Sequence, residues 1–383
     1  MNGTIYMPVG EVCSSISDTY REKKNMVTLI NTSDVLEGRV LNHERVPNSN
    51  LKGQFKKTFQ RDDILYSEIR PQNRRFAYVD FSPIDYIAST KLMVIRAKKD
   101  VVSPKYLYYF LKNSSTVAEL QLLAETRSGT FPQITFSEVA NLTIPVPSLA
   151  VQEVIVQTMQ CLEDKITCNE QINDNLAELL QTVYQDRFGD VSAATEQGML
   201  SDICSYSRDR VAVSELNTST YFSTENMLPG KAGSTDASSL PTIPQTTACH
   251  KGDTLISNIR PYFKKIVYCE GRCGCSTDVL CFTPVQPKYA AYLFSTLYAD
   301  KFFAFMVAGS KGTKMPRGDK QQIMAYPVAL PPDEELDEFN ALALPILAQL
   351  HSNKVENKRL SATRDALLPK LMSGEIEVSG IQL

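Results

Sequence analysis

Two long segments of the chain repeat apolar residues at alternating steps of four and three. The first runs from Val151 to Phe188 without a proline or glycine, and the second follows 184 positions later. Such steps place apolar side chains along one helix face and are typical of a coiled-coil seam. The chain is therefore predicted to form two long helices that pack against each other. The seam positions are Ile155, Met159, Leu162, Ile166, Asn169, Asn173, Leu176, Leu180 and Val183, then Phe339, Ala343, Ile346, Leu350, Asn353, Asn357, Leu360, Arg364 and Leu367.

Both seams contain two asparagines at matched positions, Asn169 and Asn173 in the first helix and Asn353 and Asn357 in the second. A buried amide fixes the register of paired helices, because slippage leaves its hydrogen bonds unmade. The alternative is two amphipathic helices that each pack on their own domain. The matched asparagines favour an antiparallel coiled coil in which each helix leads away from its own domain. A helix of about 30 residues spans roughly 45 Å.

The repeat extends beyond the helices. Residues 61–71 read RDDILYSEIRP and residues 251–261 read KGDTLISNIRP, with six of eleven positions identical. Average composition gives roughly one match over that length. The chain is therefore a diverged tandem duplication, with copies near 1–190 and 191–383, and its repeats are too few and too long for a solenoid. Further matches are Ser89-Thr90 with Ser276-Thr277, Pro104-Lys105-Tyr106 with Pro287-Lys288-Tyr289, and Gly129-Thr130 with Gly312-Thr313.

Each copy divides into a domain and a helix. Short β-branched and aromatic runs between glycine, proline and asparagine breaks predict α+β domains with short strands. The runs DILYSEIR and DTLISNIR alternate apolar and polar residues as half-buried strands do, and an Arg-Pro turn ends each one. Proline-rich stops precede both helices, and Pro345 predicts a kink or a late start in the second. The predicted bounds are 1–148 and 191–331 for the domains, and 149–190 and 332–383 for the helices, in a pseudo-two-fold internal repeat.

Charge is distributed unevenly along the chain. The 383 residues carry a net charge of −3, which taken whole argues against a nucleic-acid binder. Residues 151–190 carry −6 and residues 333–377 carry −4, so the rest of the chain carries +7. The domains are therefore basic and the helices acidic. No secretory signal or uncharged membrane-length segment is visible, so we expect a cytoplasmic protein without membrane contact and with reduced cysteines.

The layout and its motifs resemble the DNA-specificity subunit of type I restriction–modification systems. DILYSEIRP and DTLISNIRP resemble a strand motif of that family, and residues 127–155 resemble its join between domain and helix. Residues 223–231 and 364–378 resemble the opening of its second domain and its C-terminal end. The resemblance implies two target-recognition domains, each reading half of a bipartite double-stranded DNA sequence. It also implies that the helices separate these domains and dock methyltransferase (modification) subunits, which restriction (motor nuclease) subunits join.

Basic residues gather beside the repeated motifs, and we predict that they bind DNA. Arginine and lysine contact phosphates, and arginine with asparagine or glutamine can read base edges. The alternative is that each one is a solvated loop charge; Arg70 and Arg260, which occur in both copies, could also tie the strand to its domain. The aromatic residues interleaved with them are Phe55, Phe59, Phe76, Tyr262 and Phe263. The predicted DNA-binding residues are Lys56, Lys57, Arg70, Arg74, Arg75, Arg127, Arg260, Lys264, Lys265, Lys311, Lys314 and Arg317.

Motifs for catalysis are missing from the sequence. It contains no G-x-x-x-x-G-K-[ST] phosphate loop, no Asn-Pro-Pro-aromatic motif of amino-methyltransferases, and no Ser/His/Asp context of a hydrolase. We therefore expect no catalytic residue and no cofactor, and a chain that depends on partners. Two rival hypotheses are a stand-alone methyltransferase or nuclease with an unrecognised site, and a coiled-coil interaction protein that does not bind DNA.

A cysteine-rich stretch is the strongest candidate for a metal site. It contains Cys269, Cys273, Cys275 and Cys281, and Cys249-His250 precede it. The C-x3-C-x-C spacing differs from the paired C-x2-C of structural zinc sites. The pattern therefore favours buried thiols over a metal site.

Shortening both helices by one heptad tests their predicted role as a spacer. Seven helical residues span about 10 Å, and half-sites one turn of DNA apart are separated by roughly 34–36 Å. We predict that the number of unspecified base pairs between the two half-sites changes in this variant. Mapping of methylated bases in cells measures that number, and an unchanged methylated motif contradicts the spacer role.

Overall fold

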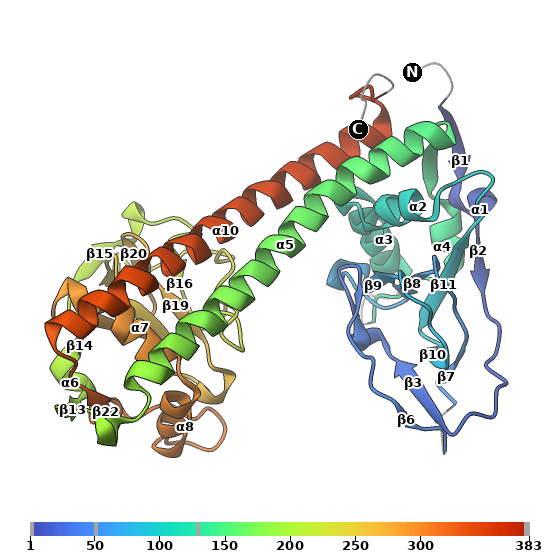
Figure 1. The fold of residues 1–383 in the computed structure, drawn as a ribbon. Helices are drawn as coiled ribbons and strands as arrows, with labels where there is room; N and C mark the ends of the chain where they lie inside the picture. The colour runs from blue at the N-terminus through green and yellow to red at the C-terminus, as the bar shows by residue number, and fades with distance from the viewer. Residues whose placement is uncertain (1–3, 50–52, 128–130, 379–383) are drawn as a thin grey trace. The chain divides into compact units, whose positions relative to one another are not determined.

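The computed structural model describes residues 4–49, 53–127 and 131–378. The chain forms two compact units: unit 1 contains Met1–Ile166 and Asn357–Leu383, and unit 2 contains Thr167–Glu356. The long helices α5 (Leu149–Phe188, green in Figure 1) and α10 (Asp333–Ser373, red) each contribute a part to both units. The domain bounds expected from the sequence stay a prediction. Within the described ranges, no helix has the length and apolar character needed to cross a membrane.

Unit 1 is built on two four-stranded sheets. The first has the order β2-β11-β8-β9 with antiparallel neighbours, and the second has the order β6-β3-β10-β7. Its strands are β1 (Ile5–Pro8), β2 (Cys13–Ile16), β3 (Met26–Ile30), β4 (Val35–Leu36), β5 (Arg39–Val40), β6 (Val46–Pro47), β7 (Phe55–Lys57), β8 (Ile64–Ser67), β9 (Phe76–Tyr78), β10 (Tyr86–Ser89), β11 (Leu92–Ala97) and β12 (Thr143–Val146). Its short helices are α1 (Val9–Val12), α2 (Pro104–Lys112), α3 (Ser114–Arg127) and α4 (Phe136–Asn141), with 3₁₀ turns η1 (Thr32–Asp34) and η2 (Pro71–Asn73).

Unit 2 repeats this plan. Its sheets have the orders β14-β21-β18-β19 and β15-β17-β20-β16. The strands are β13 (Gln197–Met199), β14 (Cys204–Tyr206), β15 (Arg210–Ala212), β16 (Tyr221–Phe222), β17 (Gln245–Cys249), β18 (Thr254–Ser257), β19 (Ile266–Tyr268), β20 (Cys273–Cys275), β21 (Val279–Pro284) and β22 (Pro327–Ala329). The helices are α6 (Leu200–Ile203), α7 (Ala290–Tyr298), α8 (Asp300–Ala308) and α9 (Lys320–Met324), with 3₁₀ turns η3 (Val191–Ala193), η4 (Val213–Glu215), η5 (Pro261–Phe263) and η6 (Pro287–Tyr289).

The repeated sequence motif forms a central strand in both units, β8 and β18. The expectation of half-buried strands is wrong, because every residue of both strands is buried. Each strand lies between two apolar clusters: Ile64 packs in one core of unit 1 and Leu65 in another. In unit 2, Ile256 and Leu255 divide in the same way. A strand covered on both faces carries no solvent-facing side.

A buried tyrosine ties the domain of each unit to the strand that precedes a long helix. The Tyr106 hydroxyl donates to the Pro145 carbonyl at 2.8 Å, and the Tyr292 hydroxyl donates to the Ala329 carbonyl at 2.7 Å. Both acceptors lie on the short strand that ends just before its helix. The start of each helix is therefore fixed to its own domain, because breaking the bond leaves a buried hydroxyl unsatisfied.

The two long helices lie antiparallel within each unit. In unit 2, Asn169 Nδ2 donates to Glu356 Oε2 at 2.7 Å, and Asn353 Nδ2 donates to Asn173 Oδ1 at 2.9 Å. In unit 1, Asn357 Nδ2 donates to the carbonyl of Ile166 at 3.3 Å. Residues further along α5 therefore bond to residues that come earlier in α10, as antiparallel helices require. All four seam asparagines make contacts across the helix pair; their role in fixing the register stays a prediction.

The second helix does not start late. It begins at Asp333 and continues through Pro345 to Ser373, so that expectation is wrong. Three acidic residues in its first turn complement the positive end of the helix dipole. Phe339, Ala343 and Leu347 bury this stretch against the core of unit 2, which offsets the backbone hydrogen bond that proline cannot make. A kink at Pro345 stays a prediction.

A buried aspartate precedes the central strand in each unit, with different partners. Asp63 accepts two hydrogen bonds from Arg96, at 2.7 and 2.8 Å, and its side chain is 1% exposed. Asp253 is equally buried, but Thr283 on β21 takes the place that Arg96 has on β11. Its Oδ2 accepts the His250 backbone N–H at 2.8 Å, and burial raises the pKa of the Asp253 carboxyl.

Matched Asp→Asn substitutions are predicted to affect the two units differently. Asp63→Asn removes the ion pair of Arg96 and should destabilise unit 1 by about 2 kcal/mol. Asp253→Asn should cost unit 2 less than about 1 kcal/mol, because ionised Asp253 lacks an opposing arginine.

The Asp253 contribution should also depend on pH. Because burial raises its pKa, unit 2 loses stability as pH rises from the ordinary value of 3.8 through the raised value. The stability loss caused by Asp253→Asn should therefore shrink as pH rises above that ordinary value, because the wild type loses stability on ionisation and the uncharged asparagine does not. Hydrogen–deuterium exchange of the β8 and β18 peptides in urea reports each unit separately. Equal losses in both variants, at every pH, contradict this account.

Candidate nucleic-acid interface

Two loops from distant parts of the sequence meet beside the Arg-Pro turn of each unit. In unit 1 the Arg70 backbone N–H donates to the Pro132 carbonyl at 3.1 Å, and Ile69 forms a β-bridge with Gln133. In unit 2 the Arg260 N–H donates to the Pro316 carbonyl at 2.8 Å, and Ile259 forms a bridge with Arg317. We name these surfaces edge 1 (residues 68–75 and 131–134) and edge 2 (residues 258–265 and 311–318).

The Arg-Pro turn has the same unusual backbone in both edges. Arg70 and Arg74 adopt φ values of 45° and 52°, and Arg260 and Lys264 adopt 51° and 51°. This left-handed region is unfavourable for residues with a Cβ. It is held by the 3₁₀ turn between the two left-handed residues, which begins with a buried proline in each unit. The side chains of each turn therefore leave a fixed backbone.

Three of the predicted DNA-binding residues hold loops together. Lys57 Nζ donates to the carbonyls of Thr90 and Leu92 at 3.1 and 2.8 Å, and Lys265 Nζ donates to that of Thr224 at 2.6 Å. Burial lowers the pKa of both lysines. Arg75 Nη1 donates to the Ser33 carbonyl at 3.0 Å. Their hydrogen bonds to backbone carbonyls give these three cations a structural role.

Three cations of edge 2 pair with carboxylates at the surface. Lys264 Nζ lies 2.9 Å from Asp300, Lys311 Nζ lies 2.5 Å from Asp319, and Arg317 Nη2 lies 2.9 Å from Asp278. The Lys311 side chain is 81% exposed and that of Arg317 57%. Exposed pairs of this kind contribute about 0–1 kcal/mol each. A polyanion can therefore compete for these cations.

The remaining predicted cations differ in their surroundings. Lys56 and Lys314 are exposed, and Arg70 lies 5.9 Å from the centre of the Phe131 ring. Arg260 Nε is buried, and no hydrogen-bond partner for it exists among the described residues. Arg127 ends α3, and its side chain, like Gly129 and Thr130 of the matched loop, lies outside the described residues.

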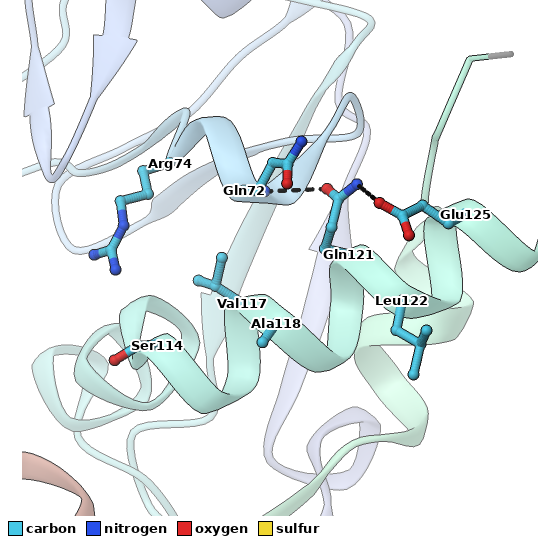
Figure 2. A pocket seen from close by; sticks show the side chains of 8 residues that line it. All are labelled: Gln72, Arg74, Ser114, Val117, Ala118, Gln121, Leu122 and Glu125. Carbon is cyan, nitrogen blue, oxygen red and sulfur yellow. Dashed lines mark hydrogen bonds between the residues drawn. The ribbon is translucent and has the colours of Figure 1, made fainter. Parts of the chain in front are cut away.

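Arg74 borders a hollow of about 390 Å³ between η2 and α3 (Figure 2). The Gln72 backbone N–H donates to Gln121 Oε1 at 3.2 Å, and Gln121 Nε2 donates to Glu125 Oε1 at 2.7 Å. Figure 2 shows Arg74 extending away from this chain of hydrogen bonds. In unit 2, Lys264 occupies the matching position and pairs with Asp300, the first residue of α8. Ser114 begins α3, so that carboxylate is not repeated in unit 1.

The predicted aromatic residues divide between core and surface. Phe59 and Phe76 are 7% and 2% exposed, so the expectation that they accompany the DNA-binding cations is wrong. They pack in the two cores that cover β8. Tyr262 and Phe263 are 49% and 39% exposed on edge 2.

Two exposed apolar residues at matched places are not among those predicted from the sequence. Phe131 and Met315 are 50% and 52% exposed, and each directly precedes the proline whose carbonyl binds the Arg-Pro turn. The signal that could have found them is their position between the matched Gly-Thr pairs and the prolines that follow, Pro132 and Pro316.

The cysteine-rich stretch lies in a core of unit 2. Cys249, Cys269, Cys273, Cys275 and Cys281 are all buried free thiols of one apolar cluster. Cys273 Sγ lies 3.4 Å from Cys269 Sγ, and hydrogen bonds with the neighbouring thiols raise the pKa of Cys249. Across the described ranges, no three His, Cys, Asp or Glu side chains are arranged to hold a metal ion.

Part of the chain matches a known family of domains. Residues 6–178 match the family model of the type I restriction modification DNA specificity domain. Over 164 residues the chain is 42% identical to the type I restriction enzyme HindI specificity subunit of Haemophilus influenzae. That match covers 43% of this chain and 36% of the relative, so it spans about a third of that protein. The MjaIX specificity subunit of Methanocaldococcus jannaschii is 22% identical over 332 residues, 78% of this chain and 76% of the relative.

Solved structures share the fold over the whole chain. The type I restriction–modification S subunit from M. genitalium superposes with a TM-score of 0.53 at 16% identity, covering 99% of this chain and 98% of that one. A chain from a type I restriction–modification system, studied for complex assembly and conformational transition, gives 0.51 at 17% identity, with 98% and 99% covered. The matched domain and the related sequences lead to one conclusion: residues 6–178 belong to the type I restriction modification DNA specificity domain family, and the chain as a whole is similar to the specificity subunits of such systems.

Proposed function

We propose that the chain is a non-catalytic subunit that recognises a bipartite sequence in double-stranded DNA, with unit 1 and unit 2 each reading one half. The observation that carries this proposal is the repetition of one two-loop edge in both units. Each edge has the same Arg-Pro turn and the same backbone bond to a second loop. Two similar but diverged surfaces suit two different half-sites.

The chemistry of the edges supports contacts with both phosphates and bases. Exposed Lys314 and the loosely paired Lys311 and Arg317 can bind phosphates. Arg260 Nε and Asn258 Oδ1 are buried without a hydrogen-bond partner among the described residues. Arginine and asparagine are side chains that read guanine and adenine in the major groove.

The charge distribution supports different binding partners for the domains and the helices. The segments that contain the helices carry −10 together and the rest of the chain carries +7. DNA is therefore attracted to the domains and repelled by the helices. The acidic helices remain available for the modification subunits, which restriction subunits join in our proposal.

Base-modification mapping in cells with and without this chain tests the proposal. We predict that deletion removes methylation from one two-part motif and that re-expression restores it, since the modification subunits depend on the chain for their target. Deletion of the modification subunit serves as the control and should remove the same motif. A methylation pattern that does not change on deletion contradicts the proposal.

Matched lysine substitutions on edge 2 separate DNA contact from loop support. Lys314→Gln should weaken binding to all duplexes alike and reduce the slope of log affinity against log salt by about 1. Lys265→Gln changes the same charge but removes the bond to Thr224, so it should loosen the 223–231 loop and leave the salt slope unchanged. Fluorescence anisotropy at several salt concentrations measures the slope, and hydrogen exchange measures the loop. If Lys314→Gln and the wild type have the same slope of log affinity against log salt, Lys314 does not contact a phosphate.

A further inference from the structure

Three large apolar side chains are exposed on the two loops of edge 2. Tyr262, Phe263 and Met315 are 49%, 39% and 52% exposed. A single exposed apolar residue is ordinary on a protein surface. These three lie on two loops that the Arg260–Pro316 backbone bond and the Ile259–Arg317 bridge join. We call these three residues the apolar tip.

The apolar tip is held outward by a rigid backbone. Tyr262 and Phe263 belong to η5, which lies between the left-handed residues Arg260 and Lys264 and begins with buried Pro261. Their ring centres are 4.7 Å apart with an angle of 55° between the planes. The turn therefore fixes where these two side chains leave the backbone. A side chain that separates stacked bases needs this rigidity, because ordering it on binding would reduce affinity.

We propose, as an extension of the proposed function, that the apolar tip is a wedge that unstacks a base step in the half-site of unit 2. The surroundings favour DNA as the occupant. Lys311, Lys314 and Arg317 flank Met315 in sequence, and Lys264 follows the two aromatic rings. Cations that bind the phosphates on either side hold the duplex while apolar groups enter between its bases.

Edge 1 provides a comparison inside the same molecule. At the positions of Tyr262 and Phe263 it carries Gln72 and Asn73, both polar and exposed. Phe131 is its exposed apolar residue at the place of Met315, and the Arg70 guanidinium lies 5.9 Å from the Phe131 ring. The half-site of unit 1 is therefore read without unstacking. Pyrimidine–purine steps unstack most easily, so the half-site of unit 2 contains a TA or CA/TG step.

Fluorescent base analogues test the wedge with the full chain and its modification subunits. The probe is a set of duplexes with the motif found by base-modification mapping, in which one adenine or cytosine at a time is 2-aminopurine or pyrrolocytosine. Both analogues brighten when unstacked. The modification subunits take the methylated base itself out of the stack, so that position carries no analogue in either half-site. Among the remaining positions we expect one bright step in the half-site of unit 2 and none in that of unit 1. Affinity is measured on the same duplexes by fluorescence anisotropy.

The variant Tyr262→Ala/Phe263→Ala/Met315→Ala should lose the bright step and bind about tenfold more weakly. Ile243→Ala removes an apolar side chain of unit 2 that is 47% exposed outside the edge, and it should change neither signal. Hydrogen exchange of β18 shows whether each variant is folded, and Met315→Ala alone provides a milder variant with a smaller loss of brightness.

The outcomes separate the two proposals. Absence of sequence-specific binding by the wild type overturns the proposed function. Specific binding without a bright step, or a bright step that survives in the folded triple variant, overturns the wedge and leaves the proposed function standing. Equal brightness in both half-sites overturns the assignment of unstacking to unit 2.

Discussion

The complete burial of one strand, β8 in unit 1 and β18 in unit 2, positions each recognition edge. Apolar cores on both faces hold this strand. The chain must then leave the sheet abruptly, and it does so through left-handed Arg70 and Arg260. Because the strand cannot shift between two packed layers, the turn that follows it is fixed, and the second loop binds to it through Pro132 or Pro316.

Duplication preserved this framework while local chemistry diverged. Asp63 is neutralised by Arg96, whereas Asp253 faces Thr283 in a core that also contains five thiols. Similarly, Lys264 pairs with Asp300 while Arg74 borders an open hollow. The sheet that contains the central strand has the same order in both units, β2-β11-β8-β9 and β14-β21-β18-β19, although these polar contacts differ. The fold therefore depends on the buried strands. The side chains at the edges can differ between the units, as two different DNA half-sites require.

Patterns with a strong period or an exact repeat were predictable. The seam spacing gave both long helices, and Asn169, Asn173, Asn353 and Asn357 all make contacts between them. The Arg-Pro turns ended β8 and β18 as expected. Predictions about burial were weaker. Lys57 and Lys265 bind backbone carbonyls, and Phe59 and Phe76 are in the core, because proximity in sequence to a basic cluster does not indicate which face a side chain occupies.

The sequence by itself determined the duplication, the two helices, the acidic and basic segments and the resemblance to a family, because these depend on residue order and local periodicity. Only the tertiary structure decided which cations are free, which are tied, and that Phe131 and Met315 stand exposed beside the Arg-Pro turns. Each edge joins loops about 60 residues apart, in a range where loop closure depends on packing rather than on local preference. That packing, set by two cores on either side of one strand, is what assembles the site.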